Sequence, residues 1–148
     1  IAFVSTIEDL SIGLLRKGGY QKELIDHGLE SDPNLVLDLT GSSHPHDLIK
    51  SFLSLHEFDG VISADNTSSL MFQSIIKSEK PELADEMMMI GFSDEKNALL
   101  SYPRINYIDQ KAMKIGEKAA EMLINRLESK DAVVKAETFE MSHQIHMS

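Results

Sequence analysis

Acidic, amide and hydroxyl side chains gather in the short segments that separate the apolar runs of this sequence. These polar segments are residues 5–9, 40–43, 65–66, 93–95 and 109–110. Carboxylates accept hydrogen bonds from adjacent hydroxyls, and amides both donate and accept. The pattern favours binding of a neutral polyol such as a sugar, although the same residue types are also ordinary in loops. None of these segments has the glycine-rich sequence that cradles phosphates.

Histidines form two further groupings that could hold a metal. His44, His46 and Asp47 surround a proline, but two histidines that flank a proline ahead of a helix are more often solvated. His143 and His146 lie in the tail of the chain and are a weaker signal still. We therefore predict no metal site.

Nucleophilic catalysis has little support in the sequence. A triad could be drawn from Ser5 or Ser11 with a histidine and an aspartate, but no nucleophile-elbow glycine pattern surrounds either serine. The run Met87-Met88-Met89 is more typical of a buried strand than of a cofactor site. We predict no catalytic residue, no enzyme activity and no cofactor.

Short apolar runs alternate along the chain with stretches of helical apolar spacing. The expected strands are residues 1–5, 35–39, 59–64, 87–92, 105–108 and 132–141. The expected helices are residues 10–27, 47–56, about 67–78 and 111–127. Strands separated by helices form βαβ units, so we predict an α/β fold, a parallel sheet of about five to six strands with helices on both faces. In such sheets ligands bind beyond the carboxyl ends of the strands, where the polar segments lie.

Composition excludes several classes of function. The chain has 148 residues, with 24 Asp and Glu against 14 Lys and Arg and a formal net charge of -10. Phosphate neutralisation needs a basic face, so this chain alone is not expected to bind nucleic acid. No apolar run approaches the ~18 residues of a membrane span. The absence of cysteine excludes disulfides, thiolate zinc sites and a cysteine nucleophile.

Four short motifs follow one another along the chain. They are R-K-G-G-Y starting at Arg16, D-G-V-I-S-A-D-N ending at Asn66, I-G-F-S-D ending at Asp94, and P-R-I-N-Y-I-D-Q ending at Gln110. In this order they resemble R-x-x-G-Y/F, a strand ending in A-N-D, G-F/Y-D-D and P-x-L-T-T-I-x-Q of LacI/GalR-type transcriptional regulators. The family also has a glycine and an A-x-x-L-L helix after the last motif, and Gly116 and the segment from Ala119 to Leu123 resemble these. The resemblance covers roughly residues 1–127 of this chain. The part of the family that it matches is the C-terminal part of the effector-binding domain.

The resemblance implies a periplasmic-binding-protein-like fold, in which two Rossmann-like subdomains enclose a small effector, usually a sugar, a sugar phosphate or a nucleobase. Residues 1–110 would be the C-terminal subdomain. Residues 111–130 would be a crossover helix that belongs to the other subdomain in relatives, and residues 131–148 the final strand and tail. Operator DNA would be bound only by a helix-turn-helix headpiece absent from this chain. The implied location is cytoplasmic.

The resemblance also implies effector-binding residues, taken position by position. Arg16 matches the arginine that contacts effector in several relatives. Asp65 and Asn66 reverse the family's Asn-Asp order, so Asp65 is expected either to bind effector hydroxyls or to cap the following helix. Ser93 replaces the aspartate that commonly clamps effector hydroxyls, which predicts an altered effector or a lost site. Gln110 matches the hinge glutamine and is expected to act first in the crossover and second as a ligand contact.

The helix near residues 67–78 has more apolar residues than one buried stripe needs. They are Leu70, Met71, Phe72, Ile75 and Ile76. In the resembled family this helix lies at the dimer interface, so we expect a homodimer with Met71, Phe72 and Ile75 in contact with the second chain. Packing within the core alone is the alternative.

The sequence leaves three classes of function. The first is an effector-sensing, dimerising module of a DNA-binding regulator. The second is a sugar-binding protein of a transport system, which shares the fold and would have an export signal upstream. The third is a receiver-type signalling domain, in which Glu8 and Asp9 would be the acidic pair, Asp65 the phosphate acceptor and Lys111 the lysine after the fifth strand.

Overall fold

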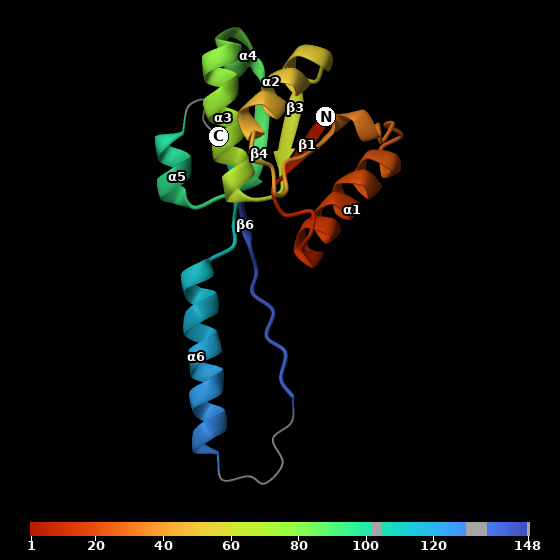
Figure 1. Cartoon of the computed structure of the whole chain (residues 1–148). Coiled ribbons are helices and arrows are strands. Elements are labelled where there is room, and N and C mark those ends of the chain that lie inside the picture. Colours follow the sequence, from red (N-terminus) through yellow and green to blue (C-terminus); the bar gives the residue numbers. More distant parts are fainter. Residues whose placement is uncertain (102–104, 130–135, 148) are drawn as a thin grey trace.

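The computed structural model describes residues 1–101, 105–129 and 136–147, and within these ranges six strands form one sheet. The strands are β1 (Ala2–Ser5), β2 (Val36–Asp38), β3 (Gly60–Ser63), β4 (Met88–Phe92), β5 (Asn106–Asp109) and β6 (Gln144–His146), in the order β2-β1-β3-β4-β5-β6. The pairs among β1 to β5 are parallel, whereas β6 is antiparallel to β5. The α/β fold predicted from the sequence is confirmed, with a sheet that is mostly parallel (Figure 1).

Helices lie between the successive strands. They are α1 (Ser11–Asp26), α2 (Pro45–Leu55), α3 (Asn66–Glu79), α4 (Pro81–Glu86), α5 (Glu95–Leu100) and α6 (Ala112–Glu128), and a 3-10 turn, η1 (Pro33–Leu35), leads into β2. The four long helices lie close to the predicted ranges. The short helices α4 and α5 were not predicted, because six residues are too few to display a helical period.

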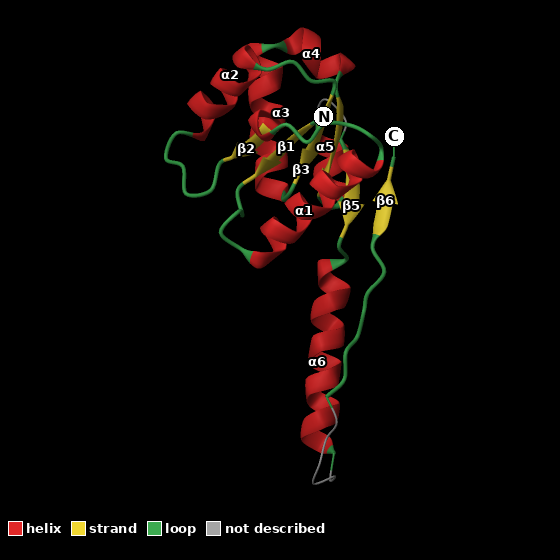
Figure 2. Ribbon diagram, turned by 90° about the vertical axis from the view of Figure 1, so that its right-hand side faces the viewer, coloured by secondary structure: helices red, strands yellow, loops and turns green. Residues whose placement is uncertain are grey.

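The two faces of the sheet are covered unequally. On one face, Phe3 of β1 packs with Tyr20 and Leu24 of α1, and the Phe3 and Tyr20 rings stack at 5.1 Å between centroids. The alternate strand residues point to the opposite face, where α2 to α5 supply the partners. Helices therefore lie on both faces, as predicted, with the larger core beneath α2 to α5 (Figure 2).

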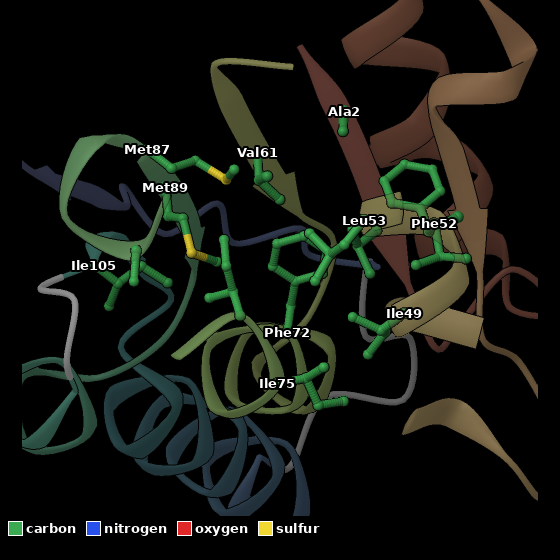
Figure 3. Close-up of a cluster of buried hydrophobic side chains, with 14 of the residues drawn as sticks. Ala2, Ile49, Phe52, Leu53, Val61, Phe72, Ile75, Met87, Met89 and Ile105 are labelled. Atoms are coloured by element: carbon green, nitrogen blue, oxygen red, sulfur yellow. The ribbon is translucent and has the colours of Figure 1, made fainter. Parts of the chain in front are cut away.

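The larger core is mostly aliphatic (Figure 3). Val61 and Met89, neighbours in register on β3 and β4, meet Ile49 of α2 and Phe72 of α3, and each of these four side chains is at most 1% exposed. Burial of a side chain of this size contributes about 1.5–3 kcal/mol. This core fixes the sheet on which the carboxyl ends of the strands are displayed.

The last strand differs from the prediction. Within the predicted strand over residues 132–141, residues 136–141 form no strand, and residues 132–135 lie outside the described part of the chain. β6 begins later, and its His146 pairs with Tyr107 of β5 and stacks on that ring at 4.4 Å between centroids. Pairing with β5, and not the local apolar pattern, therefore determines which residues of the tail form a strand.

Helix α6 projects away from the sheet (Figures 1 and 2). It has no buried residue. Residues 136–143 run back beside it (Figure 1), and Lys118 of α6 lies 5.1 Å from the centroid of the Phe139 ring. Helix α6 thus forms an arm beyond the carboxyl ends of the parallel strands, between β5 and β6 of the sheet.

Candidate functional site

Arg16 of α1 reaches across the carboxyl ends of three strands. Its Nη1 donates a 2.6 Å hydrogen bond to the carbonyl of Ala64, directly after β3. Its Nη2 donates a 2.9 Å bond to Oε1 of Gln110, directly after β5. The guanidinium carbon lies 3.5 Å from the centroid of the Phe92 ring at the end of β4, which is a cation–π contact. One side chain therefore joins the ends of β3, β4 and β5.

The first turn of α1 is held close to the loop that follows β1. The amide of Leu10 donates to the carbonyl of Ile7 at 3.0 Å. Gly13 faces the same carbonyl so closely that a Cβ at this position would lie 1.9 Å from the Ile7 oxygen. Only glycine fits there, and this close approach places Arg16, one helical turn further on, over the strand ends.

The charge of Arg16 is partly balanced by Asp65. Burial lowers the pKa of the Arg16 guanidinium, and the nearby Asp65 carboxylate opposes that shift. A guanidinium with this support stays charged at neutral pH. The site therefore contains a fixed cation whose side chain is half-buried.

Asp65 is the N-cap of α3, which is one of the two roles that the sequence left open. Its Oδ1 accepts from the amide of Ser68 at 2.8 Å, and the Ser68 hydroxyl bonds back to complete a capping box. Thr6 donates to both carboxylate oxygens, from its amide to Oδ2 at 2.9 Å and from its hydroxyl to Oδ1 at 2.8 Å. The structure therefore gives Asp65 a capping and loop-fastening role.

Asn66 and Ser93 meet at the ends of β3 and β4. The Ser93 hydroxyl donates to Oδ1 of Asn66 at 3.2 Å. The amide of Ser93 donates to the carbonyl of Ile108 on β5 at 3.3 Å. Asp94 caps α5 by accepting from the amide of Asn97 at 2.9 Å. Ser93 thus presents a neutral hydroxyl, and the adjacent carboxylate is used within the chain.

Gln110 stands where the chain leaves the sheet for α6. Lys111, the next residue, has a φ of 51°, the left-handed region that non-glycine residues rarely adopt. Its amide donates to Oδ1 of Asp109 at 2.7 Å, which stabilises this turn. The Arg16 hydrogen bond to Gln110 therefore connects α1 to the point where the chain turns toward α6.

The structure brings three of the four predicted effector residues, Arg16, Ser93 and Gln110, to the ends of β3, β4 and β5. The fourth, Asp65, lies near Arg16, and its carboxylate oxygens accept hydrogen bonds from Thr6 and Ser68.

Three contributors to the site were not predicted from the sequence. Thr6 lies in the polar segment 5–9, but no motif marked its contact with Asp65, and the Ala64 carbonyl is a backbone group that no residue type reveals. The third contributor, Phe92, lies within the G-F-S-D motif, so its position was visible but its contact with Arg16 was not.

A buried ion pair lies further along the same edge. Glu8, whose side chain is 8% exposed, bonds Lys17 at 2.6 Å, and its amide donates to the Thr40 hydroxyl after β2 at 2.9 Å. One Glu8 oxygen, Oε1, is buried without a hydrogen-bond partner among the described residues. The pair fastens the β1–α1 loop to the helix that positions Arg16.

No group of three or more His, Asp or Glu side chains is placed to hold a metal ion within residues 1–101, 105–129 and 136–147. His46 lies 3.8 Å from Glu79 and 3.7 Å from Asp47, as one member of a surface charge cluster that includes Lys50. His146 is stacked on Tyr107. In the described part of the chain, no helix is both long and apolar enough to span a bilayer.

The predicted dimer residues of α3 are mostly core residues. Phe72 is 0% exposed and Ile75 is 7% exposed, so neither has surface to offer a second chain, and this part of the prediction is corrected. Met71 is partly buried against the same core. The exposed apolar residue of α3 is Leu70, at 44%. Helical periodicity identifies two apolar stripes here but does not say which one faces the sheet.

Comparison with known proteins relates this chain to transcriptional regulators. No protein-family model matches the chain. The chain is 29% identical over 134 residues to the HTH-type transcriptional regulator RegA of Clostridium saccharobutylicum, a match that covers 88% of this chain and 40% of RegA. This chain therefore spans less than half of the length of RegA.

Solved structures share the fold. The transcription regulator CcpA of Lactococcus lactis matches 99% of this chain and 53% of its own, with a TM-score of 0.79 at 19% identity. A regulatory protein of the LacI family from Chloroflexus aggregans matches 88% of this chain and 48% of its own, with a TM-score of 0.70 at 18% identity. A complex of the transcriptional regulator CelR with cellobiose matches 85% of this chain and 39% of its own, with a TM-score of 0.70 at 21% identity.

These comparisons confirm the resemblance found in the sequence. The chain shares its fold with these solved regulators, one of them a regulatory protein of the LacI family, and covers 53% and 48% of the first two chains. Its relatives in sequence are transcriptional regulators.

Proposed function

We propose that this chain is the effector-sensing and dimerising module of a LacI-type transcriptional regulator and binds a small sugar-like ligand. The observation that carries the proposal is the convergence of Arg16 on Ala64 and Gln110 at the carboxyl ends of β3 and β5. Parallel sheets bind ligands at this edge. The CelR–cellobiose complex, which shares the fold, supports a sugar as the ligand class.

The proposed mechanism is a shift of population rather than catalysis. Residues 1–110 form one wall of a ligand cleft. Residues 111–130, which contain α6, belong to a second lobe. The lack of buried residues in α6 supports this division, because a helix with exposed apolar side chains needs a partner elsewhere. Ligand bound between the lobes stabilises the closed arrangement and changes the geometry of distant DNA-binding headpieces. Operator DNA is contacted only by those headpieces, in the cytoplasm.

The homodimer is proposed through the outer side of the α2–α3 layer. Exposed apolar side chains of these helices are Leu48 and Leu55 of α2, at 42% and 76%, and Leu70 of α3, at 44%. Met71 is partly buried against the core to which Phe72 and Ile75 belong. No cofactor, metal or membrane is part of the proposal, and the chain has no enzymatic role in it.

The receiver-type alternative loses its main support. A phosphate acceptor needs a free carboxylate, whereas both oxygens of Asp65 accept hydrogen bonds from Thr6 and Ser68. The transport-protein alternative shares the fold, but the relatives in sequence are transcriptional regulators. We therefore favour the regulator.

Ligand binding by the full-length protein tests the proposal. Thermal unfolding is followed with and without cellobiose and a panel of other mono- and disaccharides, since a ligand that binds only the folded state raises the melting temperature. We expect at least one sugar to stabilise the protein and Arg16→Ala to reduce that effect. A panel in which no sugar, neutral or charged, raises the melting temperature would contradict the proposal.

A further inference from the structure

The strand β6 is attached to the sheet with little buried surface. It has three residues, Gln144–His146, and all three are exposed. It is the last strand in the sheet order and pairs with β5, antiparallel to it. Residues 136–143 lead into it from beside α6 (Figure 1). The attachment of β6 therefore determines how the segment that returns from the arm is held to the sheet.

The side chain of His146 covers a core residue of β5. Its ring stacks on the Tyr107 ring, with 4.4 Å between the centroids and 7° between the ring planes. Tyr107 is 9% exposed and belongs to the larger core together with Ala98 and Ile105. Ile145, the middle residue of β6, is 56% exposed. The stacked ring of His146 therefore joins β6 to the core.

Negative charge surrounds this pair of rings. Burial raises the pKa of the Tyr107 hydroxyl, and the carboxylates of Glu95, Asp109 and Asp94 raise it further. Asp94 and Glu95 stand at the start of α5, and Asp109 ends β5. The other residues of β6 carry no charge. A positive charge on the ring that covers Tyr107 is therefore attracted by carboxylates from two elements.

We propose that the stack of His146 on Tyr107 is a pH-sensitive contact, in which the protonated ring holds β6 on β5 more tightly than the neutral ring does. An imidazolium over the face of a tyrosine gains a cation–π attraction that the neutral ring lacks. Because His146 is exposed, the charged form keeps most of its hydration. Histidine ordinarily changes its charge between pH 5 and 8, so β6 is held more tightly as the pH falls through this range.

This contact links pH to the arm of the molecule. The register places Gln144 opposite Asp109, one residue before Gln110, where the chain leaves the sheet for α6. When β6 loosens at higher pH, the segment that returns from α6 is released from β5, while the core beneath α2 to α5 stays intact. The contact does not depend on the proposed function, because it involves β5, α5 and β6 and no effector.

Hydrogen–deuterium exchange of the full-length protein, measured by mass spectrometry, tests the inference. Exchange is compared at about pH 5.5 and about pH 7.5, on either side of the usual histidine transition, with labelling times corrected for the intrinsic exchange rate. We expect the protection of the β6 amides to be about two- to fivefold higher at the lower pH. The amides of β3, whose strand lies inside the sheet, provide the internal reference and should not respond.

Substitutions of exposed residues separate charge from stacking. His146→Phe keeps a stacked ring without a charge, so its β6 protection should be equal at both pH values. His146→Arg places a permanent cation over Tyr107, because a guanidinium also stacks on aromatic rings, and should keep the high protection at both pH values. Glu95→Gln removes one of the carboxylates and should reduce the response. His143→Gln removes a histidine of the same segment and serves as the control, with the response unchanged.

Three results would overturn the inference. The first is β6 protection in the wild type that is equal at the two pH values or higher at about pH 7.5. The second is a response that persists unchanged in His146→Phe, because another group would then be titrating. The third is a response that is lost in His143→Gln but kept in the His146 variants. The sugar-binding test of the proposed function is independent of all three.

Discussion

Arg16 shows how much of this site depends on one helix being held close to one loop. The arginine spans three strand ends only because α1 starts directly against the Ile7 carbonyl. That closeness exists because position 13 has no Cβ. At the scale of single residues, Gly13 is therefore as important to the site as the arginine itself.

Gly13→Ala should destabilise the protein. Its Cβ would lie 1.9 Å from a backbone oxygen, so the loop or the helix must move, at a cost of about 1–3 kcal/mol or more. Urea unfolding followed by circular dichroism measures the change. Because α1 would shift, ligand affinity should fall as well.

Glycines of the same helix provide the matched control. Gly18 and Gly19 have nothing within 4 Å of an added Cβ. Gly18→Ala should therefore stabilise α1 by roughly 0.5–1 kcal/mol through helix propensity alone. If both substitutions changed stability in the same direction, the packing explanation for Gly13 would be wrong.

Asp65 allows a second test at the same scale. Asp65→Ala removes the cap of α3 and leaves the amide and hydroxyl of Thr6 without their acceptor. We expect a loss of about 1–2 kcal/mol in the free energy of unfolding. Asp65→Asn keeps a capping oxygen and should lose less. An alanine variant as stable as the wild type, but with abolished ligand binding, would instead make Asp65 a direct ligand residue.

At the scale of elements, α3 shows that the sequence identifies the apolar residues of a helix but not which of them are buried against the sheet. Phe72 is fully buried and Leu70 is 44% exposed. We expect Phe72→Asp to unfold the domain, because it places a charge in the core. Leu70→Asp should leave the fold intact and weaken the proposed dimer, measured by analytical ultracentrifugation of the full-length protein. If the Phe72→Asp variant were instead folded and monomeric, Phe72 would be a residue of the dimer interface and not of the core.

The long elements could be predicted from the sequence because their apolar periods extend over several turns. The helix over residues 111–127 is observed as α6, and the helix over residues 10–27 is observed as α1, which Gly28 follows with a φ of 70°. Strand ends were also predictable, which placed Ser93 and Gln110 on one edge, whereas Arg16 was singled out by the family resemblance. The Asp65–Thr6 contact was not, because it joins residues 59 positions apart and no local rule specifies it.

Helices α2 and α3 are connected by a charge pair that makes their packing sensitive to acid. Lys50 bonds Glu79 at 2.8 Å, and this hydrogen bond lowers the pKa of the Glu79 carboxyl. A carboxyl whose pKa is lower in the folded state stabilises the fold at neutral pH, and that contribution is lost as pH falls through the folded pKa. Both groups lie at the surface, so the effect is small.

Glu79→Gln should therefore lower stability at pH 7 slightly and should not lower it once the carboxyl is protonated. Urea midpoints of the wild type and the variant are compared at pH 7 and well below the ordinary glutamate pKa of 4.5. The two curves should converge at the acid end. A constant gap across the pH range would show that the substitution acts through packing and not through charge.

At the scale of the whole molecule, the arm formed by α6 is the feature that the body of the chain does not explain. Its apolar side chains Met113, Leu123 and Leu127 are 79%, 59% and 76% exposed, and exposed apolar surface of this kind marks an interface. We expect the 148-residue chain alone to self-associate through α6. The double substitution of Leu123 and Leu127 by Glu should shift it toward monomer in light scattering without changing its urea midpoint, because neither side chain belongs to the core. A wild-type chain that stays monomeric and free of aggregates at high concentration would contradict this interpretation of the arm.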